Sequence, residues 1–413
     1  MVSEPAAPAA WPTVAYESLP WQPADVPASR TARRRYRGPY GAAVVPPIVS
    51  VAVVLRSETA AVVEEAAAEI ARFDAELGRE IAPFAAVLLR SESAASSKIE
   101  NLTVSARAIA EAELNGHAGR NASMIVANER AMSAAIALAK RIDGEAILAM
   151  HAALLQRSDP DIAGRWRDQP VWIGGGDLGP HGAAFVPPRH DRVPAGIADL
   201  VAFIERDDVP VIAHAALAHA QFETIHPFPD GNGRTGRALV HAHLRAKGLI
   251  RNVTVPVSAG LLTDIDGYFA ALTRYRGGDP TAIVEAFAAA TFRAVANGRL
   301  LVDDLHTIRQ DWQERVHARR DAAAWRVAEL LLRHPVVNAA LVAAEIGIAP
   351  QNAYRSLRPL VDAGVLVEFT DRKRNQLWRA PEVLDALDRF AARAGRRNRN
   401  SPEAPLNART TQV

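Results

Sequence analysis

Residues 224–237, Thr-Ile-His-Pro-Phe-Pro-Asp-Gly-Asn-Gly-Arg-Thr-Gly-Arg, form the most informative segment of the chain. Apolar residues at helical spacing precede and follow it, whereas its own prolines and glycines predict a short loop. We expect one helix over residues 213–222 and a second helix from Asn232 to Ala246. The loop then lies over a helix N-terminus, where unpaired N–H groups and the positive end of the helix dipole bind anions.

Charged and basic side chains surround this expected anion site. Arg234 and Arg237 are three residues apart on the first helical turn, so both can donate hydrogen bonds to phosphate oxygens. Asp230 suits a hard divalent cation that also contacts the phosphates. His226 carries an imidazole that, when neutral, accepts a proton from an attacking hydroxyl. A base, a metal ligand and a phosphate clamp so close together favour nucleotidyl or phosphoryl transfer.

Three alternative roles for the glycine-rich loop fit less well. Gly231, Gly233 and Gly236 match the dinucleotide fingerprint G-x-G-x-x-G, but no strand precedes them and the acidic residue expected about 20 residues later is missing. The chain has no G-x-x-x-x-G-K-[ST] motif, which excludes a P-loop. A purely structural loop would account for glycines and prolines, but not for two arginines, an Asn, an Asp and a His that converge on it. We therefore interpret the loop as a polyphosphate site.

Residues 226–237 also resemble the signature of the Fic family, H-x-F-x-[DE]-G-N-G-R-x-x-R, at every defined position. The resemblance implies an all-helical core with a β-hairpin flap, and transfer of AMP from ATP to a Ser, Thr or Tyr hydroxyl of a protein. It implies that His226 is the base, that Phe228 anchors the loop in the core and that Asp230 binds Mg²⁺. ATP and Mg²⁺ are thus the expected cofactors.

The same resemblance implies which residues contact each part of ATP. It implies that Asn232 and the glycine N–H groups bind the α-phosphate, while Arg234 and Arg237 bind the β- and γ-phosphates. Tyr268 resembles an aromatic residue near the adenine, although Arg276 stands where the family pattern has Asn. The implied nucleotide contacts are Gly231, Asn232, Gly233, Arg234, Gly236, Arg237, Tyr268, Ile173 and Gly174.

Two short extended segments around a glycine-rich turn, at residues 171–173 and 184–188, predict a β-hairpin. Together with Gly-Arg-Trp-Arg at 164–167 they are similar to the Fic flap, which pairs with a target segment by β-augmentation. Spacing alone leaves an ordinary surface hairpin equally open.

Ser96-Ser97-Lys98-Ile99-Glu100-Asn101 resembles the inhibitory motif [ST]-x-x-x-E-[GN] of Fic proteins. Ser96 and Glu100 are four residues apart and share one helix face. A carboxylate that reaches Arg237 would occupy the guanidinium that must bind the γ-phosphate, and ATP would then bind unproductively. The resemblance therefore implies a self-inhibited enzyme.

The predicted fold class is mainly α, with a Fic-type helical core, a β-hairpin flap and a C-terminal winged helix. The expected divisions are a disordered leader (1–40), a helical region with the inhibitory helix (41–140), the Fic core (141–298), a helical connector (299–322), a winged helix (323–392) and a disordered basic tail (393–413). In the winged helix, the polar side chains Gln351, Asn352, Arg355 and Arg358 and a basic wing at Arg372, Lys373 and Arg374 are candidate DNA contacts.

Composition narrows the class of protein further. The 413 residues contain no cysteine, which excludes disulfides, thiolate zinc sites and cysteine nucleophiles. The longest apolar stretch, residues 42–55, is interrupted by two prolines and falls short of the roughly 20 residues that span a bilayer. No signal-peptide pattern begins the chain, so we expect a cytoplasmic protein without membrane contacts. His214, His219, His241 and His243 lack a metal-ligand pattern and are expected in the core or at the surface.

The leading hypothesis is a self-inhibited protein adenylyltransferase whose partner is a protein with a modifiable hydroxyl, including automodification. One alternative is a DNA-binding regulator that uses the winged helix, with the Fic core as a nucleotide sensor. Another is an enzyme of the same fold that removes AMP from a modified protein. Homodimerisation, the target and the direction of transfer stay open.

Overall fold

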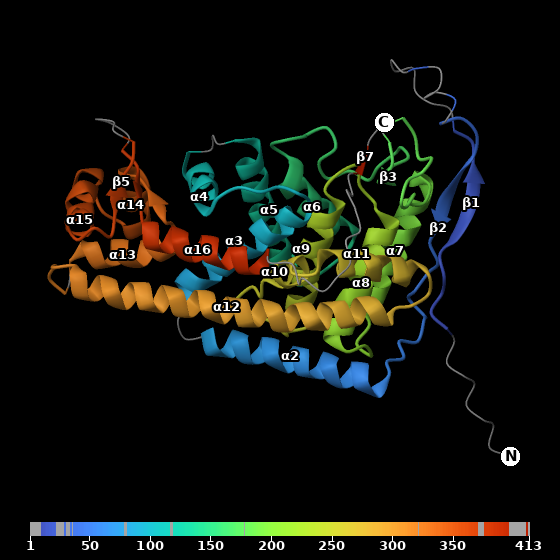
Figure 1. Cartoon of the computed structure of the whole chain (residues 1–413), viewed down its shortest axis with the longest axis horizontal. Helices are drawn as coiled ribbons and strands as arrows, with labels where there is room; N and C mark the ends of the chain where they lie inside the picture. The colour runs from blue at the N-terminus through green and yellow to red at the C-terminus, as the bar shows by residue number, and fades with distance from the viewer. Residues whose placement is uncertain are drawn as a thin grey trace.

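The computed structural model describes residues 10–21, 29, 34, 36–77, 81–115, 119–176, 178–320, 322–370, 376–395 and 410–411. Helices account for most of these residues, and the strands form only small antiparallel sheets (Figure 1). The predicted mainly α fold class is confirmed.

Most of the helices follow one another with short connections, but a long segment that contains the flap separates α6 from α7. They are α2 (Ser57–Leu77), α3 (Ile81–Ile99), α4 (Ala106–Asn115), α5 (Arg120–Ala137), α6 (Gly144–Leu155), α7 (Val193–Glu205), α8 (Val211–Ile225), α9 (Asn232–Ala246), α10 (Val257–Leu262), α11 (Ile265–Arg276), α12 (Thr281–Arg315), α13 (Ala323–Arg333), α14 (Ala339–Ile346), α15 (Pro350–Asp362) and α16 (Pro381–Ala394). A short 3₁₀ turn, His190–Arg192, precedes α7.

The strands pair in three small sheets. β1 (Ala15–Leu19) pairs with β2 (Tyr40–Val44), β3 (Trp172–Ile173) pairs with β7 (Thr410–Thr411), and β4 (Val336–Val337), β5 (Val367–Glu368) and β6 (Trp378–Arg379) form the order β4-β6-β5, all antiparallel.

Helix α8 lies at the centre of the predicted catalytic core. Every residue from Ile212 to Ile225 is buried, because α7, α9 and α12 surround the helix. Five alanines along α8 allow these neighbours to approach closely. A helix that is buried on all sides holds its C-terminal end, where the catalytic loop begins, in a fixed position.

The four histidines near the loop are core residues, as one of the two expectations had it. His214, His219, His241 and His243 are each at most 1% exposed. The ring of His214 lies 2.7 Å from the Phe203 carbonyl, and burial lowers its pKa to about 4. His241 lies 2.7 Å from the carboxylate of Glu92. No group of three or more His, Asp or Glu side chains in the described part of the chain could hold a metal ion.

The expected disordered leader is wrong for residues 10–21. This segment contains β1, and its Trp11 and Val14 are buried. Trp11 packs on Tyr275 with ring centroids 5.7 Å apart, and Trp21 meets Trp172 edge to face at 5.6 Å. Burial of these large side chains against distant segments stabilises the strand despite the many prolines. Residues 1–9, 22–28, 30–33 and 35 lie outside the described residues.

The C-terminal region has the element order of a winged helix, helix-strand-helix-helix-strand-strand, followed by α16. Sequence spacing missed β4, since a strand of two residues leaves almost no pattern. Gln351, Asn352, Arg355 and Arg358 are exposed on α15. The wing turn, residues 371–375, lies outside the described residues, so its three basic side chains stay a prediction.

The expected boundary at residue 298 falls inside a helix. Helix α12 runs for 35 residues without a break, through both the end of the predicted core and most of the predicted connector (Figure 1). Near its end, the indole N–H of Trp312 donates to the Glu382 carboxylate, and Arg315 bridges to the same carboxylate at 2.6 Å. The core and the C-terminal region therefore share one helix.

The described part of the predicted tail consists of the end of α16 and of β7, while residues 396–409 and 412–413 lie outside it. None of the helices in the described ranges is both long enough and apolar enough to cross a bilayer.

Helix α2 packs along α12 where α12 carries a glycine (Figure 1). Phe73 of α2 is fully buried, and a Cβ atom on Gly298 would lie only 2.9 Å from Cζ of its ring. The glycine thus makes room for the ring, although glycine weakens a helix interior.

We predict that Gly298→Ala destabilises the protein by about 1 kcal/mol, because overpacking costs roughly 1–3 kcal/mol and outweighs the gain of about 1 kcal/mol in helix propensity. Thermal unfolding of both proteins measures the change. Combining the substitution with Phe73→Leu should cost less than the sum of the two single effects. An unchanged or higher melting temperature for Gly298→Ala would contradict this packing argument.

Candidate active site

The loop between α8 and α9 begins and ends with left-handed backbone. His226 has φ 50° and closes α8, its N–H donating to the Phe222 carbonyl at 2.8 Å. Gly231 has φ 78°, and a Cβ atom there would lie 2.9 Å from Leu154. Helix α9 then begins at Asn232, as predicted. The first N–H groups of α9, those of Asn232 and its successors, have no carbonyl partner within the helix and face the loop.

Asn232 holds the loop together. Its side-chain oxygen accepts from the Phe228 N–H at 2.9 Å, and its side-chain N–H donates to the Phe228 carbonyl at 2.8 Å. Both ends of the amide are therefore used inside the protein. The Asn232 side chain therefore positions the loop, while its implied contact with the α-phosphate stays a prediction.

Phe228 is fully buried, as the resemblance implies for an anchor. Its ring stacks on His151 of α6 at 3.7 Å between centroids. The Gly164 N–H donates to Nδ1 of His151 at 3.0 Å, so the proton of the neutral ring is on Nε2, which donates to the Asp230 carbonyl at 3.0 Å. Burial lowers the pKa of His151 to about 4, which keeps the ring neutral. His151 thus holds the loop in place from α6, a role that no sequence motif indicated.

His226 presents a free imidazole. The side chain is 4% exposed, and neither ring nitrogen has a hydrogen-bond partner among the described residues. Burial, reinforced by the nearby charges of Arg167 and Arg276, lowers its pKa to about 3. The guanidinium of Arg167 also donates to the His226 carbonyl at 2.8 Å and so fixes the backbone. A neutral, unpaired imidazole is the form that accepts a proton.

Glu223 lies one helical turn before His226, with a carboxylate oxygen 3.8 Å from Nδ1 of the imidazole. Burial raises its pKa to about 7, an effect that Arg237 opposes and Glu100 reinforces. Oε1 has no partner in the described structure. The sequence analysis missed this residue, although its spacing from His226 on α8 would have placed the two side chains on one face.

The guanidinium of Arg234 has fewer hydrogen-bond partners than it has N–H groups in the described structure. The side chain is 3% exposed, yet Nε and Nη1 have no hydrogen-bond partner among the described residues. Nη2 lies 3.4 Å from the Asp230 carboxylate. Buried guanidinium atoms without partners are costly, and an anion would satisfy them. The expected phosphate-binding role of Arg234 fits this geometry.

Arg237 meets the segment predicted to be inhibitory. Its Nε donates to the Ser96 hydroxyl at 2.9 Å, and its Nη2 donates to the Ser96 carbonyl at 2.9 Å and to the Glu100 carboxylate at 2.8 Å. Asn101, with φ 63°, ends the turn after α3, while the Leu102 N–H donates to the Ser97 carbonyl at 3.0 Å. Asn and Gly tolerate this backbone best, which explains the [GN] position of the motif.

The Glu100 carboxylate also covers the N-terminus of α9. A Cβ atom on Gly233 would collide with Oε1 of Glu100. The carboxylate therefore lies against the same helix turn on which a phosphate would bind. Gly236, by contrast, faces α8, where a Cβ atom would lie 2.9 Å from Phe222. Its expected nucleotide contact is replaced by close helix packing.

The flap has the hairpin geometry that the sequence predicted. The Ile173 N–H donates to the Phe185 carbonyl at 2.9 Å, and the Ala184 N–H donates to the Ile173 carbonyl at 2.8 Å. Gly174 turns the chain with φ 73°. The guanidinium of Arg276 lies 3.7 Å from the centre of the Phe185 ring. Arg276, which stands where the family pattern has Asn, therefore packs against the flap.

Tyr268 is not at the surface of the site. It is 2% exposed, and its hydroxyl lies 2.7 Å from Nε2 of His219. Burial raises the pKa of the phenol above its usual value. In this conformation the ring belongs to the core under Arg237, which differs from the expected contact with adenine.

The fold and this loop define a helical domain in which the buried imidazole of His226 lies in the loop before the N-terminus of α9. Residues 141–244 match the model of the Fic/DOC family. A crystal structure of a Fic family protein from Desulfovibrio desulfuricans has a TM-score of 0.50 and 22% identity, covering 79% of this chain and 97% of that one, which supports the fold. The chain therefore contains a Fic domain.

Two relatives match parts of the sequence. A probable protein adenylyltransferase of Aquifex aeolicus is 43% identical over 70 residues, which are 17% of this chain and 22% of that protein. Protein adenylyltransferase fic-1 of Caenorhabditis elegans is 33% identical over 105 residues, which are 25% of this chain and 19% of that protein. The matched regions thus span about a fifth of these curated relatives.

We predict that Glu223→Gln makes stability less dependent on pH. The folded pKa of about 7 lies above the unfolded value of 4.5, so the wild type loses stability as pH rises from 4.5 towards 7. The loss should total roughly 3 kcal/mol, and glutamine, which does not ionise, should abolish it. Denaturant unfolding at several pH values measures this, with Glu64→Gln at an exposed position of α2 as the control. Parallel pH profiles for wild type and Glu223→Gln would contradict the prediction.

Proposed function

We propose that this protein is a self-inhibited protein adenylyltransferase that moves AMP from ATP to a Ser, Thr or Tyr hydroxyl of a protein. The observation that carries the proposal is the buried, unpaired imidazole of His226 beside the N-terminus of α9, within a Fic domain. The names of the matched relatives support the same reaction.

In the proposed reaction, His226 takes the proton of the target hydroxyl. The hydroxyl oxygen then bonds to the α-phosphorus of ATP, and the bond from that phosphorus to the β-phosphate bridging oxygen breaks, releasing pyrophosphate. The N–H groups at the start of α9 and the unpaired atoms of Arg234 stabilise the phosphate charge. Arg237, once released from Glu100, binds the γ-phosphate.

The residues present fit Mg²⁺ that arrives with the nucleotide. Asp230 lies at the loop with a side chain that is 47% exposed, and it is the single acidic side chain within the described loop. Mg²⁺ is commonly bound by one or two carboxylates together with substrate phosphates and water, so a lone aspartate suffices. When bound, the ion would neutralise phosphate charge.

The flap offers a peptide-binding edge. Strand β3 pairs with Phe185 on one side, and on its other edge it accepts an antiparallel partner, β7. A target segment that pairs with β3 through its main chain would bring a neighbouring hydroxyl to the loop. Backbone pairing of this kind selects extended segments and leaves the side-chain sequence open.

We predict that His226→Ala lowers the rate of AMP transfer by about 10²- to 10⁴-fold, the usual contribution of a general base. Because the imidazole makes no hydrogen bond to the described residues, the variant should fold and should bind ATP nearly as well as wild type. Incorporation of labelled AMP and calorimetric ATP binding, measured side by side, separate the two effects. Wild-type transfer by a folded variant would rule out this role.

We predict that Glu100→Gly raises AMP transfer roughly tenfold to a hundredfold, since a hydrogen bond between charged groups contributes about 1.5–3 kcal/mol to the inhibited arrangement. Ser96→Ala, which removes one weaker contact with Arg237, should activate less. Arg237→Ala breaks the same pair but should not activate, because the γ-phosphate loses its ligand. Transfer by Glu100→Gly no higher than wild type, at any ATP concentration, would leave Glu100 as an ordinary carboxylate.

A further inference from the structure

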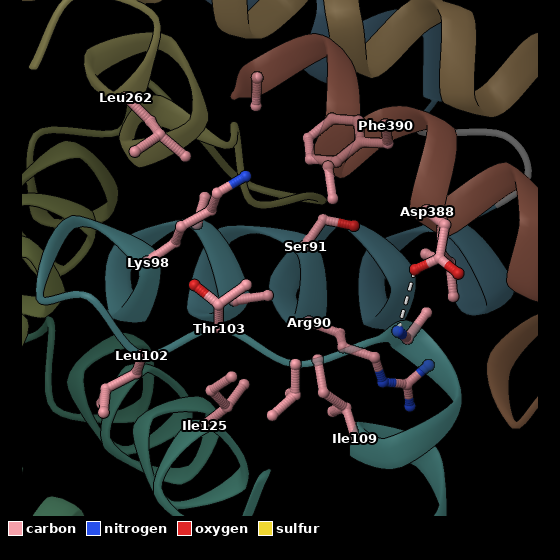
Figure 2. Close-up of a pocket in the computed structure, with 17 residues that line it drawn as sticks. Arg90, Ser91, Lys98, Leu102, Thr103, Ile109, Ile125, Leu262, Asp388 and Phe390 are labelled. Carbon is pink, nitrogen blue, oxygen red and sulfur yellow. Dashed lines mark hydrogen bonds between the residues drawn. The ribbon is translucent and has the colours of Figure 1, made fainter. Parts of the chain in front are cut away.

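A cavity lies between α3, the loop that follows it, α4 and α16, away from the catalytic loop (Figure 2). Its volume is about 90 Å³, several times the roughly 10–15 Å³ that a single water requires. The walls are mostly apolar, with Ile109, Ile125, Leu262, Leu387 and Phe390 around it. A small organic group would fit this space.

Two polar groups in this cavity have no side-chain partner among the described residues. The hydroxyl of Ser91 makes no hydrogen bond in the described structure, although the residue is 5% exposed. Figure 2 shows the Lys98 ammonium reaching towards the space between Leu262 and Phe390. No carboxylate of the described residues forms an ion pair with Lys98, whose Nζ lies close to the last turn of α16 at Gly395. The carbonyl end of a helix favours a cation nearby.

The other charged groups at this cavity are already satisfied. Arg90 makes two hydrogen bonds to the Glu113 carboxylate, at 2.6 and 2.7 Å, and a third to the Arg333 carbonyl at 2.7 Å. Asp388 accepts from the Ala106 N–H at 3.0 Å (Figure 2). Within the described part of the chain, the Lys98 ammonium and the buried Ser91 hydroxyl therefore remain without side-chain partners at this cavity, and the exposed Thr103 adds a second hydroxyl (Figure 2).

We propose that this cavity binds a small monocarboxylate with a compact apolar body. The carboxylate would pair with Lys98 and accept from Ser91, while the apolar body would fill the space between Ile125 and Phe390. A polyphosphate is disfavoured, because a single lysine cannot compensate several charges among apolar side chains.

The site is connected to the catalytic loop through α3. Ser91, Ala95 and Lys98 line the cavity, while Ser96 and Glu100 on the opposite face of the same turns contact Arg237. A ligand that bridges α3 and α16 stabilises α3 in the position in which Glu100 covers Arg237. The bound carboxylate is then an effector that strengthens self-inhibition, an inference that rests on the proposed function.

The binding test uses benzoate with the full chain, followed by calorimetry and by thermal unfolding, which ligand binding shifts upward. Lys98→Met, which keeps the length of the side chain, should weaken benzoate binding about tenfold or more, the range expected for a lost charge-assisted pair. Lys140→Met, at an exposed lysine elsewhere, should bind as wild type does. Benzyl alcohol, without the charge, should bind wild type more weakly than benzoate.

Several results would overturn the proposed site. These are no benzoate binding up to millimolar concentration, equal binding by Lys98→Met, and equal binding of benzyl alcohol and benzoate by wild type. If Lys98→Met does not fold, Ser91→Ala provides the same comparison with a smaller expected loss. None of these measurements requires AMP transfer, so they stand even if the proposed function fails.

The coupling is tested by binding of a non-hydrolysable ATP analogue with and without saturating benzoate. Benzoate should weaken analogue binding in wild type, and the analogue should weaken benzoate binding by the same factor, as linkage requires. In Glu100→Gly the effect should disappear. Benzoate binding without any such coupling would retain the site and overturn its effector role.

Discussion

The two hydrogen bonds between the Asn232 side chain and the Phe228 backbone are the constraint on which the rest of the site depends. The loop has two prolines, which lack an N–H, and it follows a fully buried helix, so few other partners are available to its backbone. Breaking the pair would leave both Phe228 backbone groups unsatisfied in the core, at a cost of about 1–3 kcal/mol each. With the loop fixed in this way, the His226 imidazole, the Asp230 carboxylate and the start of α9 have a defined geometry.

The proposed inhibition and the proposed nucleotide binding depend on the same electrostatic attraction for an anion. The N-terminus of α9 and the guanidinium of Arg237 attract an anion, and without a ligand the anion they bind is the carboxylate of Glu100. The carboxylate costs little to hold there, since 35% of the Glu100 side chain stays exposed. Arg234 keeps atoms without partners in the described structure, so part of the anion site remains available. In the proposed function, self-inhibition is therefore a competition between anions rather than a blocked entrance.

The sequence predicted the groups that make local contacts along the chain and missed those that depend on tertiary packing. The loop and the start of α9 followed from the residue pattern. The meeting of Ser96 and Glu100 with Arg237, which is far away in the sequence, was implied by the resemblance to the Fic inhibitory motif. His151 was missed because it reaches the loop from α6, far away in sequence, and only the fold brings them together. Tyr268 and Gly236 were assigned to the nucleotide, but burial decides their roles, and burial cannot be read from a motif. Outside the motif, β1 was expected to be disordered because its neighbouring prolines interrupt any apolar period, yet a few large aromatic side chains provide the packing that orders it.

The shared helix α12 has a consequence for how the length of this chain can vary. Each residue of an α-helix adds about 1.5 Å and turns the chain by about 100°. One inserted or deleted residue in the middle of α12 would therefore rotate everything beyond it and carry α16 off the surface of α3, against which it packs. A flexible linker between domains tolerates changes of length, but in α12 a change of length becomes a rotation about the helix axis. The helical phase of α12 therefore sets how α16 lies against α3.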